Sequence, residues 1–96
     1  MDSTEAIAVL GALAQPTRLE AFRLLVRHEP EGLPAGEAAR TLGVPQNTLS
    51  AHLAILAQAG LVRSQREGRQ IIYRAALGRL SELTEFLLRD CCAGPC

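Results

Sequence analysis

Residues 35–60 combine two amphipathic helical patterns that are separated only by Gly43-Val44-Pro45. The stretch AGEAARTL predicts a short helix that ends at Gly43, because glycine readily adopts the left-handed conformation of a helix C-terminal cap. Residues 46–59 predict a longer helix that Gly60 closes in the same way. Two helices joined by so short a turn form a helix-turn-helix, so the chain is restricted to folds built around that motif.

Two more helices are predicted before this motif. The first covers residues 2–14, where Ile7 and Leu10 recur with Leu13 or Ala14 at helical spacing. Pro16 suits the first turn of a second helix that runs to about residue 28. The apolar positions of this second helix that we expect to face inward are Leu19, Phe22, Leu25 and Val26. The stretch EPEGLP, residues 29–34, is rich in helix breakers and separates this helix from the motif.

A β-hairpin and a final helix are predicted after the motif. The stretches LVRSQR and RQIIYRA alternate with a period of two and are joined by Glu67-Gly68, a pair suited to a tight turn. Residues 78–90 predict a helix with one stripe of leucines, at Leu80, Leu83, Leu87 and Leu88. Four helices, a hairpin and a last helix make a mainly helical chain with a small β-hairpin, which is the winged helix-turn-helix plan. We therefore expect a single domain over residues 1–96.

The length and composition indicate one small domain that completes its core by dimerising. The chain has 96 residues, of which 48% are hydrophobic, but only Phe22, Tyr73 and Phe86 are aromatic. No stretch reaches the ~18 uninterrupted apolar residues that span a bilayer. The N-terminus carries Asp2 and Glu5, where a secretory signal would be basic, so we expect a cytoplasmic protein without a membrane partner. The sequence has no nucleophile–base pair at a suggestive spacing and no phosphate loop, so we do not expect an enzyme.

The charged residues are distributed unevenly, although the formal net charge is zero. All ten basic residues are arginines, and residues 40–74 contain five of them against the single acid Glu67. A basic middle segment of this kind is typical of a protein that binds a polyanion. The alternative is an ordinary solvated surface, which composition alone does not exclude.

The longer helix of the motif has one apolar face and one small, polar face. Leucines recur on one side of a helical wheel, at Leu49, Leu53 and Leu56. The opposite side carries Asn47, Ala51, Ala54 and Gln58, with Ser50 beside them. Such a face fits the major groove of DNA, where Gln46, Asn47 and Ser50 would reach base edges or phosphates.

Arginines flank the turn of the predicted hairpin. Arg63, Arg66 and Arg69 are expected to cluster around its tip, where a basic ribbon fits the DNA backbone or the minor groove. Together with the unobstructed helix face, they predict binding to double-stranded DNA. Two alternatives stay open: Asn47 and Ser50 are ordinary surface residues, or the domain is a protein–protein module that does not contact DNA.

Three stretches, LAQPTRLEAFRLL, NTLSAHLAILAQAGLV and REGRQIIYRA, resemble the ArsR/SmtB family of bacterial metal-responsive winged-helix repressors. The resemblance covers roughly residues 10–75 in register. It implies a homodimer formed by the first and last helices, an operator with dyad symmetry, and repression that an inducer relieves. The positions that the resemblance assigns to DNA are Gln46, Asn47, Ser50 and Ala51 in the recognition helix and Arg66 and Arg69 in the wing.

The family places its metal sites in different elements, and two of these lack the necessary ligands here. The arsenic site in the first helix of the motif needs Cys-x-Cys, whereas this chain has AGEAAR there. A zinc site on the last helix needs histidine, whereas the chain offers Glu82, Glu85 and Asp90. The cysteines of the chain all lie in its last six residues, at Cys91, Cys92 and Cys96. Some family members sense trivalent arsenic with a C-terminal cysteine cluster, so the resemblance implies a sensor tail at residues 91–96.

The spacing of the three thiols independently favours a soft, three-coordinate ligand. Adjacent Cα atoms lie ~3.8 Å apart across a trans peptide, whereas a relaxed disulfide needs ~4.4–6.8 Å, so a bridge between Cys91 and Cys92 would be strained. Gly94 and Pro95 end the helix and let Cys96 fold back as a third sulfur. Three thiolates without a fourth ligand suit As(III) or Sb(III) as the inducer. The alternatives are another soft metal, a thiol redox switch, or a tail without such a role.

Overall fold

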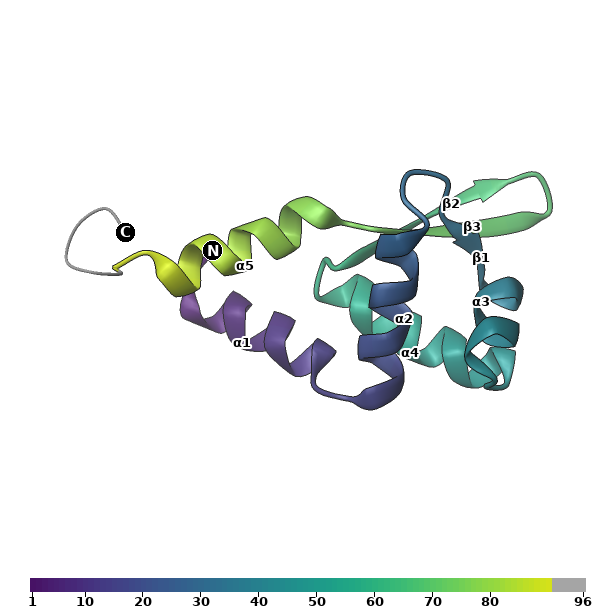
Figure 1. Cartoon of the computed structure of the whole chain (residues 1–96), viewed down its shortest axis with the longest axis horizontal. Helices are drawn as coiled ribbons and strands as arrows, with labels where there is room; N and C mark the ends of the chain where they lie inside the picture. Colours follow the sequence, from purple (N-terminus) through teal and green to yellow (C-terminus); the bar gives the residue numbers. More distant parts are fainter. Residues whose placement is uncertain (91–96) are drawn as a thin grey trace.

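The computed structural model describes residues 1–90, which fold as a winged helix-turn-helix (Figure 1). Its helices are α1 (Ser3–Leu13), α2 (Pro16–Arg27), α3 (Ala35–Leu42), α4 (Gln46–Gln58) and α5 (Leu77–Leu88). Its strands are β1 (Leu33–Pro34), β2 (Val62–Glu67) and β3 (Gln70–Ala75), which form an antiparallel sheet in the order β1-β3-β2. The predicted mainly helical fold with a helix-turn-helix and a wing is confirmed.

Local sequence signals explain where the helices begin and end. Asp2 and Glu5 form a capping box on α1, in which the Glu5 amide donates to Oδ1 of Asp2 at 2.8 Å and the Asp2 amide donates to Oε1 of Glu5 at 3.1 Å. Gln15 caps α2 because its Oε1 accepts a hydrogen bond from the Arg18 amide at 2.8 Å. Gly43, with φ of 70°, ends α3 in the left-handed conformation that the sequence predicted.

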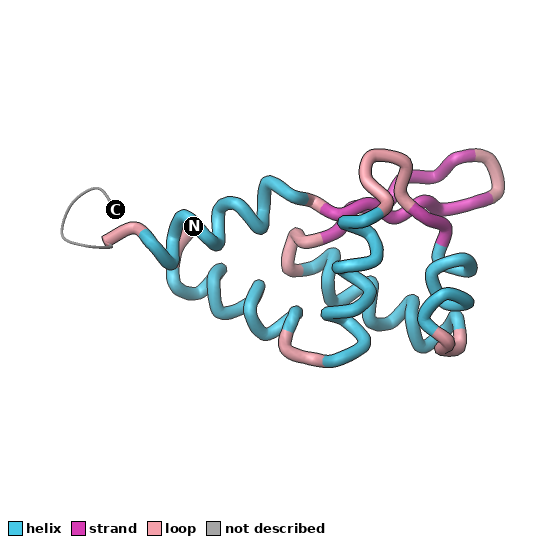
Figure 2. The backbone as a smooth tube through the Cα atoms, in the orientation of Figure 1, coloured by secondary structure: helices cyan, strands magenta, loops and turns pink. Residues whose placement is uncertain are grey.

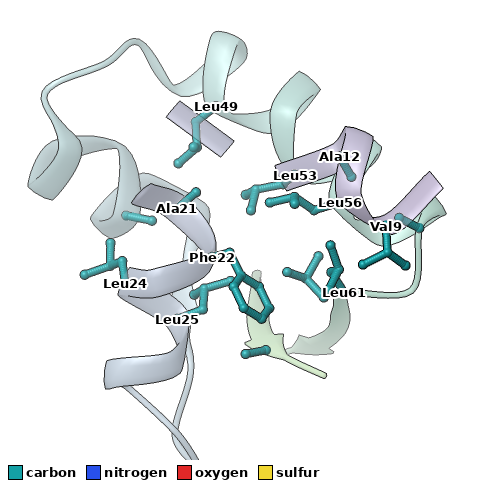
Figure 3. Close-up of a cluster of buried hydrophobic side chains, with 14 of the residues drawn as sticks. Val9, Ala12, Ala21, Phe22, Leu24, Leu25, Leu49, Leu53, Leu56 and Leu61 are labelled. Carbon is teal, nitrogen blue, oxygen red and sulfur yellow. The ribbon is translucent and has the colours of Figure 1, made fainter. Parts of the chain in front are cut away.

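The hydrophobic core lies between α2 and α4 (Figure 3). Leu49, Leu53 and Leu56 of α4 are buried, as their common side of the helical wheel predicted. Phe22 and Leu25 of α2 are buried against them, which confirms the central part of the predicted inner face of α2. Helix α4 is therefore anchored along its whole apolar side.

The inner face of α2 differs from the sequence-based expectation at its edges. Leu19 and Val26 are 42% and 37% exposed, so their assignment to the core was wrong. Ala21 and Leu24 are buried in their place. The reason is that α2 contacts α3, α4 and β3 at once, and the face that meets all three is centred on residues 21–25.

Helices α1 and α5 run side by side and extend away from the rest of the fold, and we call this pair the arm (Figures 1 and 2). In α1 the face turned to the core carries Ala6, Val9 and Ala12. Ile7 and Leu10, which the sequence marked by their helical spacing, are 69% and 44% exposed. Ile7 and Leu10 therefore lie on the outer surface of α1, whereas Ala6, Val9 and Ala12 contact the core.

The leucine stripe predicted for α5 is only partly covered. Leu83 is buried and Leu80 is half-buried, whereas Leu87 and Leu88 are 56% and 66% exposed. The helix ends at Leu88, two residues before the predicted end, a difference within the usual variation of helix boundaries. Within residues 1–90, no helix combines the length and apolarity needed to cross a membrane.

The wing is shifted by one residue from the prediction and includes a strand that was not expected. Glu67 pairs with Gln70, so the turn consists of Gly68 and Arg69, and the assignment of the turn to Glu67-Gly68 was wrong. Gly68 has φ of 66°, which glycine adopts without strain. Strand β1 lies within the stretch predicted as a break, because two residues are too few to show the alternation of a strand.

Candidate nucleic-acid interface

The outer face of α4 is open to solvent and carries only short or uncharged side chains. Asn47, Ala51, Ala54 and Gln58 are exposed and Ser50 is half-buried, as the helical wheel predicted. Ser50, Ala51 and Ala54 do not project far from the helix, so this part of α4 can approach another surface closely. This shape is the one that a helix needs in order to enter the major groove of DNA.

The first turn of α4 presents backbone donors. Its N-cap residue is Pro45, which makes no side-chain hydrogen bond to the helix. The Thr48 amide donates to Oδ1 of Asn47 at 3.0 Å, so the Asn47 oxygen is engaged locally while its NH₂ group remains a donor for another molecule. Amides at the N-terminus of a helix, together with the helix dipole, attract phosphate oxygens.

A pocket of about 400 Å³ lies between the start of α4 and the wing. Gln46 and Ser50 line it from α4, Arg40 and residues 34–37 line it from α3 and its start, and Arg69, Gln70, Ile71 and Tyr73 line it from the wing. Three of the residues that the sequence assigned to DNA, Gln46, Ser50 and Arg69, are therefore brought together. Guanidinium and amide groups are the side chains that most often contact DNA phosphates.

Arg40 and Gly36 belong to this pocket, although the sequence-based assignment did not include them. A Cβ atom at Gly36 would lie 3.3 Å from Oε1 of Gln46 and 3.6 Å from Nη1 of Arg40. The glycine thus leaves room for both side chains above the start of α3. Part of the signal was present, since Arg40 opens the basic segment, but only the contact between α3 and β3 brings it to the wing.

The three wing arginines do not form one cluster. Arg69 lies in the turn, and Arg66 lies opposite Ile71, one pair from the pair that closes the turn. Arg63 lies opposite Arg74, near the other end of the hairpin. Because side chains alternate between the two faces of a strand, Arg66 shares the face of Ile71, which lines the pocket, while Arg63 belongs to the other face. The expectation that Arg63 lies at the tip was therefore wrong.

The single acid of the basic segment is paired on the face of the wing that carries Arg63. Oε2 of Glu67 lies 3.0 Å from Nη2 of Arg74. In the part of the chain that the structure describes, Arg40, Arg66 and Arg69 have no ion-pair partner. These arginines are therefore not held in ion pairs, although the carboxylate of Glu37 also lines the pocket.

Arg18 connects α2 to the helices on either side of it. Its Nε donates to the carbonyl oxygen of Ala12 at the end of α1, at 2.6 Å. Its Nη1 lies 3.5 Å from Nδ1 of His52 on α4. The recognition helix is thus linked to α1 by a polar contact as well as by its leucines.

The predicted thiol site lies outside the described residues. Cys91, Cys92 and Cys96 follow residue 90, the last described position. Among residues 1–90, no group of three or more His, Cys, Asp or Glu side chains is arranged to hold a metal ion. The inducer site is therefore still a sequence-based prediction.

The sequence is related to known transcriptional regulators. It matches a helix-turn-helix domain family over residues 13–65. It is 37% identical over 91 residues to the biofilm growth-associated repressor of Agrobacterium fabrum, covering 95% of this chain and 75% of that protein. It is 39% identical over 75 residues to the transcriptional repressor SmtB of Mycobacterium tuberculosis, covering 78% of this chain and 53% of that protein. It is 32% identical over 82 residues to the probable mercury resistance operon repressor of Streptomyces lividans, covering 85% of this chain and 62% of that protein.

Solved structures share the fold. The ArsR-like transcriptional regulator from Rhodococcus sp. RHA1 superposes with a TM-score of 0.78 at 32% identity, covering 90% of this chain and 78% of that chain. The homodimeric winged helix-turn-helix domain Mb0332 from Mycobacterium bovis superposes with a TM-score of 0.72 at 30% identity, covering 91% and 81%. A possible transcriptional regulator for arsenical resistance superposes with a TM-score of 0.71 at 28% identity, covering 81% and 78%. These relatives are regulators and not enzymes. With its winged fold and its open, arginine-flanked α4, the chain belongs to the ArsR/SmtB family of winged-helix transcriptional regulators.

Proposed function

We propose that this chain is a homodimeric transcriptional repressor that binds operator DNA and releases it when As(III) or Sb(III) binds Cys91, Cys92 and Cys96. The observation that carries the DNA-binding part is the open, small-residue face of α4 beside a pocket with unpaired arginines. The inducer part is carried by three soft ligands within the last six residues of the sequence.

In the proposed complex α4 lies in the major groove. Asn47, Ser50 and Ala51 face the edges of the bases, and Gln46 contacts a base or a phosphate at the start of the helix. The short side chains at positions 51 and 54 let the helix axis come close to the floor of the groove. Direct reading of the operator is therefore assigned to the first two turns of α4.

The pocket and the wing hold the DNA backbone. Arg40 and Arg69 approach one phosphate from two sides of the pocket, where each guanidinium supplies charge-assisted hydrogen bonds. Arg66, on the same face of the wing, follows the neighbouring backbone or the minor groove. Arg63 makes a weaker contact, because it lies farther from the turn and on the other face.

A second copy of the chain covers the arm. Ile7 and Leu10 of α1 and Leu87 and Leu88 of α5 are exposed apolar side chains on two neighbouring helices, a pattern typical of an interface. The Mycobacterium bovis domain with this fold is homodimeric. Twofold symmetry would place two α4 helices on half-sites about one DNA turn apart.

Trivalent arsenic and antimony match the ligand set of the tail. Each sulfur of Cys91, Cys92 and Cys96 forms one bond to the metalloid and displaces one hydroxide, which leaves as water with the thiol proton. The names of two relatives, which refer to mercury resistance and to arsenical resistance, support a soft metal or metalloid. Because the first cysteine comes three residues after the end of α5, gathering the three thiols would alter how two arms pair and so change the spacing of the two α4 helices.

Release of operator DNA by arsenite tests this function. In fluorescence anisotropy with promoter DNA, arsenite should weaken binding of the wild-type protein by about five- to hundredfold. The variant with all three cysteines replaced by serine should bind DNA as the wild type does and should not respond. Release of this variant by arsenite would show that the thiols are not the site. Anaerobic titrations with peroxide distinguish a redox switch, for which peroxide would release the DNA and arsenite would not.

A further inference from the structure

Arg79, in the first turn of α5, connects the arm to the recognition helix. Its Nε donates to the carbonyl oxygen of Ala59, the C-cap residue of α4, at 3.1 Å. Carbonyl groups at the end of a helix lack intrahelical partners and carry partial negative charge, so a guanidinium group binds them favourably. The start of α5 is thereby attached to the end of α4.

The same guanidinium group holds α1. Nη1 and Nη2 of Arg79 each lie 3.4 Å from Oε2 of Glu5, whose Oε1 belongs to the capping box of α1. The Arg79 side chain is only 22% exposed. Its partner Glu5 is 45% exposed, so water partly screens this ion pair, whereas in the ion pair between Arg23 and Glu20 both side chains are exposed, at 61% and 51%. Arg79 therefore joins α1, α4 and α5 at one partly buried point.

The turn after α4 is shaped to receive this side chain. Gly60 has φ of 81°, and a Cβ atom there would lie 3.1 Å from Nε of Arg79. The Ala76 amide donates to the carbonyl oxygen of Leu61 at 2.8 Å, which ties the start of α5 to the same turn a second time. These contacts give α5 a defined starting point beside the recognition helix.

Val9 and Ala12 of α1 pack in the core with the leucines of α4, but the contact between the two helices is open along one edge. A groove of about 330 Å³ runs between the two helices, lined by Ala8, Gly11, Ala12, Ile55, Gln58 and Ala59. A Cβ atom at Gly11 would meet no other atom within 4 Å. Close packing would leave no such space, so the helices do not interlock along this edge.

We infer that Arg79 is a positioning residue that holds the arm at a fixed angle to α4. This inference rests on the proposed function, in which the arm forms the dimer interface and the inducer site follows α5. When the angle is fixed, any change in how two arms pair moves both α4 helices. When it is loose, the junction absorbs that change. Arg79 thus sets which operator spacing the dimer accepts and how much of the inducer's effect reaches the DNA.

The orientation of the arm in solution tests the inference without DNA or inducer. Residual dipolar couplings would be measured for backbone amides of the wild type, Arg79→Gln and the matched control Arg23→Gln, which makes the same change at an exposed arginine. In the wild type and the control, the arm and α2–α4 should fit one alignment tensor. In Arg79→Gln they should need two tensors. A single tensor for Arg79→Gln would overturn the inference.

Operators whose half-sites are moved apart or together by one or two base pairs provide a second test. The wild type should prefer one spacing, and Arg79→Gln should bind all spacings within about threefold of one another. Arsenite should release Arg79→Gln by less than about twofold, while the absorbance of sulfur–arsenic bonds shows unchanged arsenite binding. A wild-type spacing preference in Arg79→Gln would contradict the inference. If arsenite does not release the wild type, the proposed inducer is wrong, while the spacing series and the couplings still decide the role of Arg79.

Glu5→Gln provides a test that does not depend on the folding of Arg79→Gln. Glutamine preserves the capping box of α1 but removes the charge that Arg79 contacts. We expect a spacing preference between those of the wild type and Arg79→Gln. An unchanged preference in Glu5→Gln would contradict the proposed role of the contact between α1 and Arg79.

Discussion

Ser50, Ala51 and Ala54 give the outer face of α4 its shape, because none of them projects far from the helix. They contribute little to the core, which Leu49 and Leu53 form on the opposite side. A change at these small residues should therefore affect what the surface can approach and leave folding almost unaltered. In α4, the outer face is therefore expected to determine DNA binding, and the inner face to determine stability.

Replacing Ala51 by leucine uses this separation. The larger side chain should keep α4 away from the floor of the groove and lower operator affinity at least about tenfold, or about 1.4 kcal/mol. Because Ala51 is exposed, the free energy of unfolding should stay within about 0.5 kcal/mol of the wild type. Anisotropy and urea unfolding measure the two quantities. Wild-type affinity in Ala51→Leu would contradict the docking of α4.

Arg18 should matter for stability in a way that exposed Arg23 does not. Arg18→Met removes partly buried hydrogen bonds to Ala12 and His52 and should lower the free energy of unfolding by about 1–3 kcal/mol. Arg23→Met removes only an exposed pair and should change it by less than about 0.5 kcal/mol. Urea unfolding at one fixed protein concentration makes the comparison. Equal losses in the two variants would show that the Arg18 contacts add nothing.

Among the elements, the wing shows how strand geometry decides which charges are available. Arg66 and Arg63 are three residues apart on β2, so the alternation of side chains places them on opposite faces. Glu67 is engaged by Arg74, which leaves the turn and the pocket side positive. A charge count along the sequence does not distinguish these faces.

The dependence of operator affinity on salt should separate the wing arginines. Arg69→Ala and Arg66→Ala should each reduce the slope of log affinity against log salt by about 2 per dimer, since each subunit loses one phosphate contact. Arg63→Ala should reduce it by less than half as much. Titrations at several salt concentrations provide the slopes. Equal reductions of the salt slope in all three variants would show that the strand face on which an arginine lies does not affect its contact with phosphate.

At the scale of the whole molecule, the arm leaves a large apolar surface on a single chain. Ile7 is 69% exposed and Leu88 is 66% exposed, while Ala6, Val9 and Ala12 of α1 are buried. A partner surface accounts for this arrangement better than solvent does. We therefore expect the apolar surface of the arm to be buried against a second copy of the chain.

Ile7→Asp should separate the proposed dimer without unfolding the chain. The charge would be buried in the interface, so sedimentation should show a monomer. Affinity for an operator with two half-sites should fall about 100-fold or more, because the two α4 helices are no longer linked. Leu19→Asp is the control, since Leu19 is also an exposed apolar residue, at 42%, but lies on α2, outside the arm. If Ile7→Asp stays dimeric, the interface lies elsewhere.

The sequence by itself determined the order of the helices and most of the recognition helix. Gly43 ends a helix because of its own backbone freedom, and Leu49, Leu53 and Leu56 share a face because of helical periodicity. Both effects act within a few residues, so they can be recognised in a linear pattern. The thiol site at Cys91, Cys92 and Cys96 is a prediction from the sequence alone.

Only the tertiary structure decided the features that depend on residues far apart in the chain. In the folded chain Ala6 and not Ile7 lies on the inner face of α1, and Arg40 lies beside the wing. The tertiary structure also joins Arg79 to Glu5 and Ala59, which lie 74 and 20 residues away. Such contacts depend on how whole elements pack, and no local propensity or period encodes that packing.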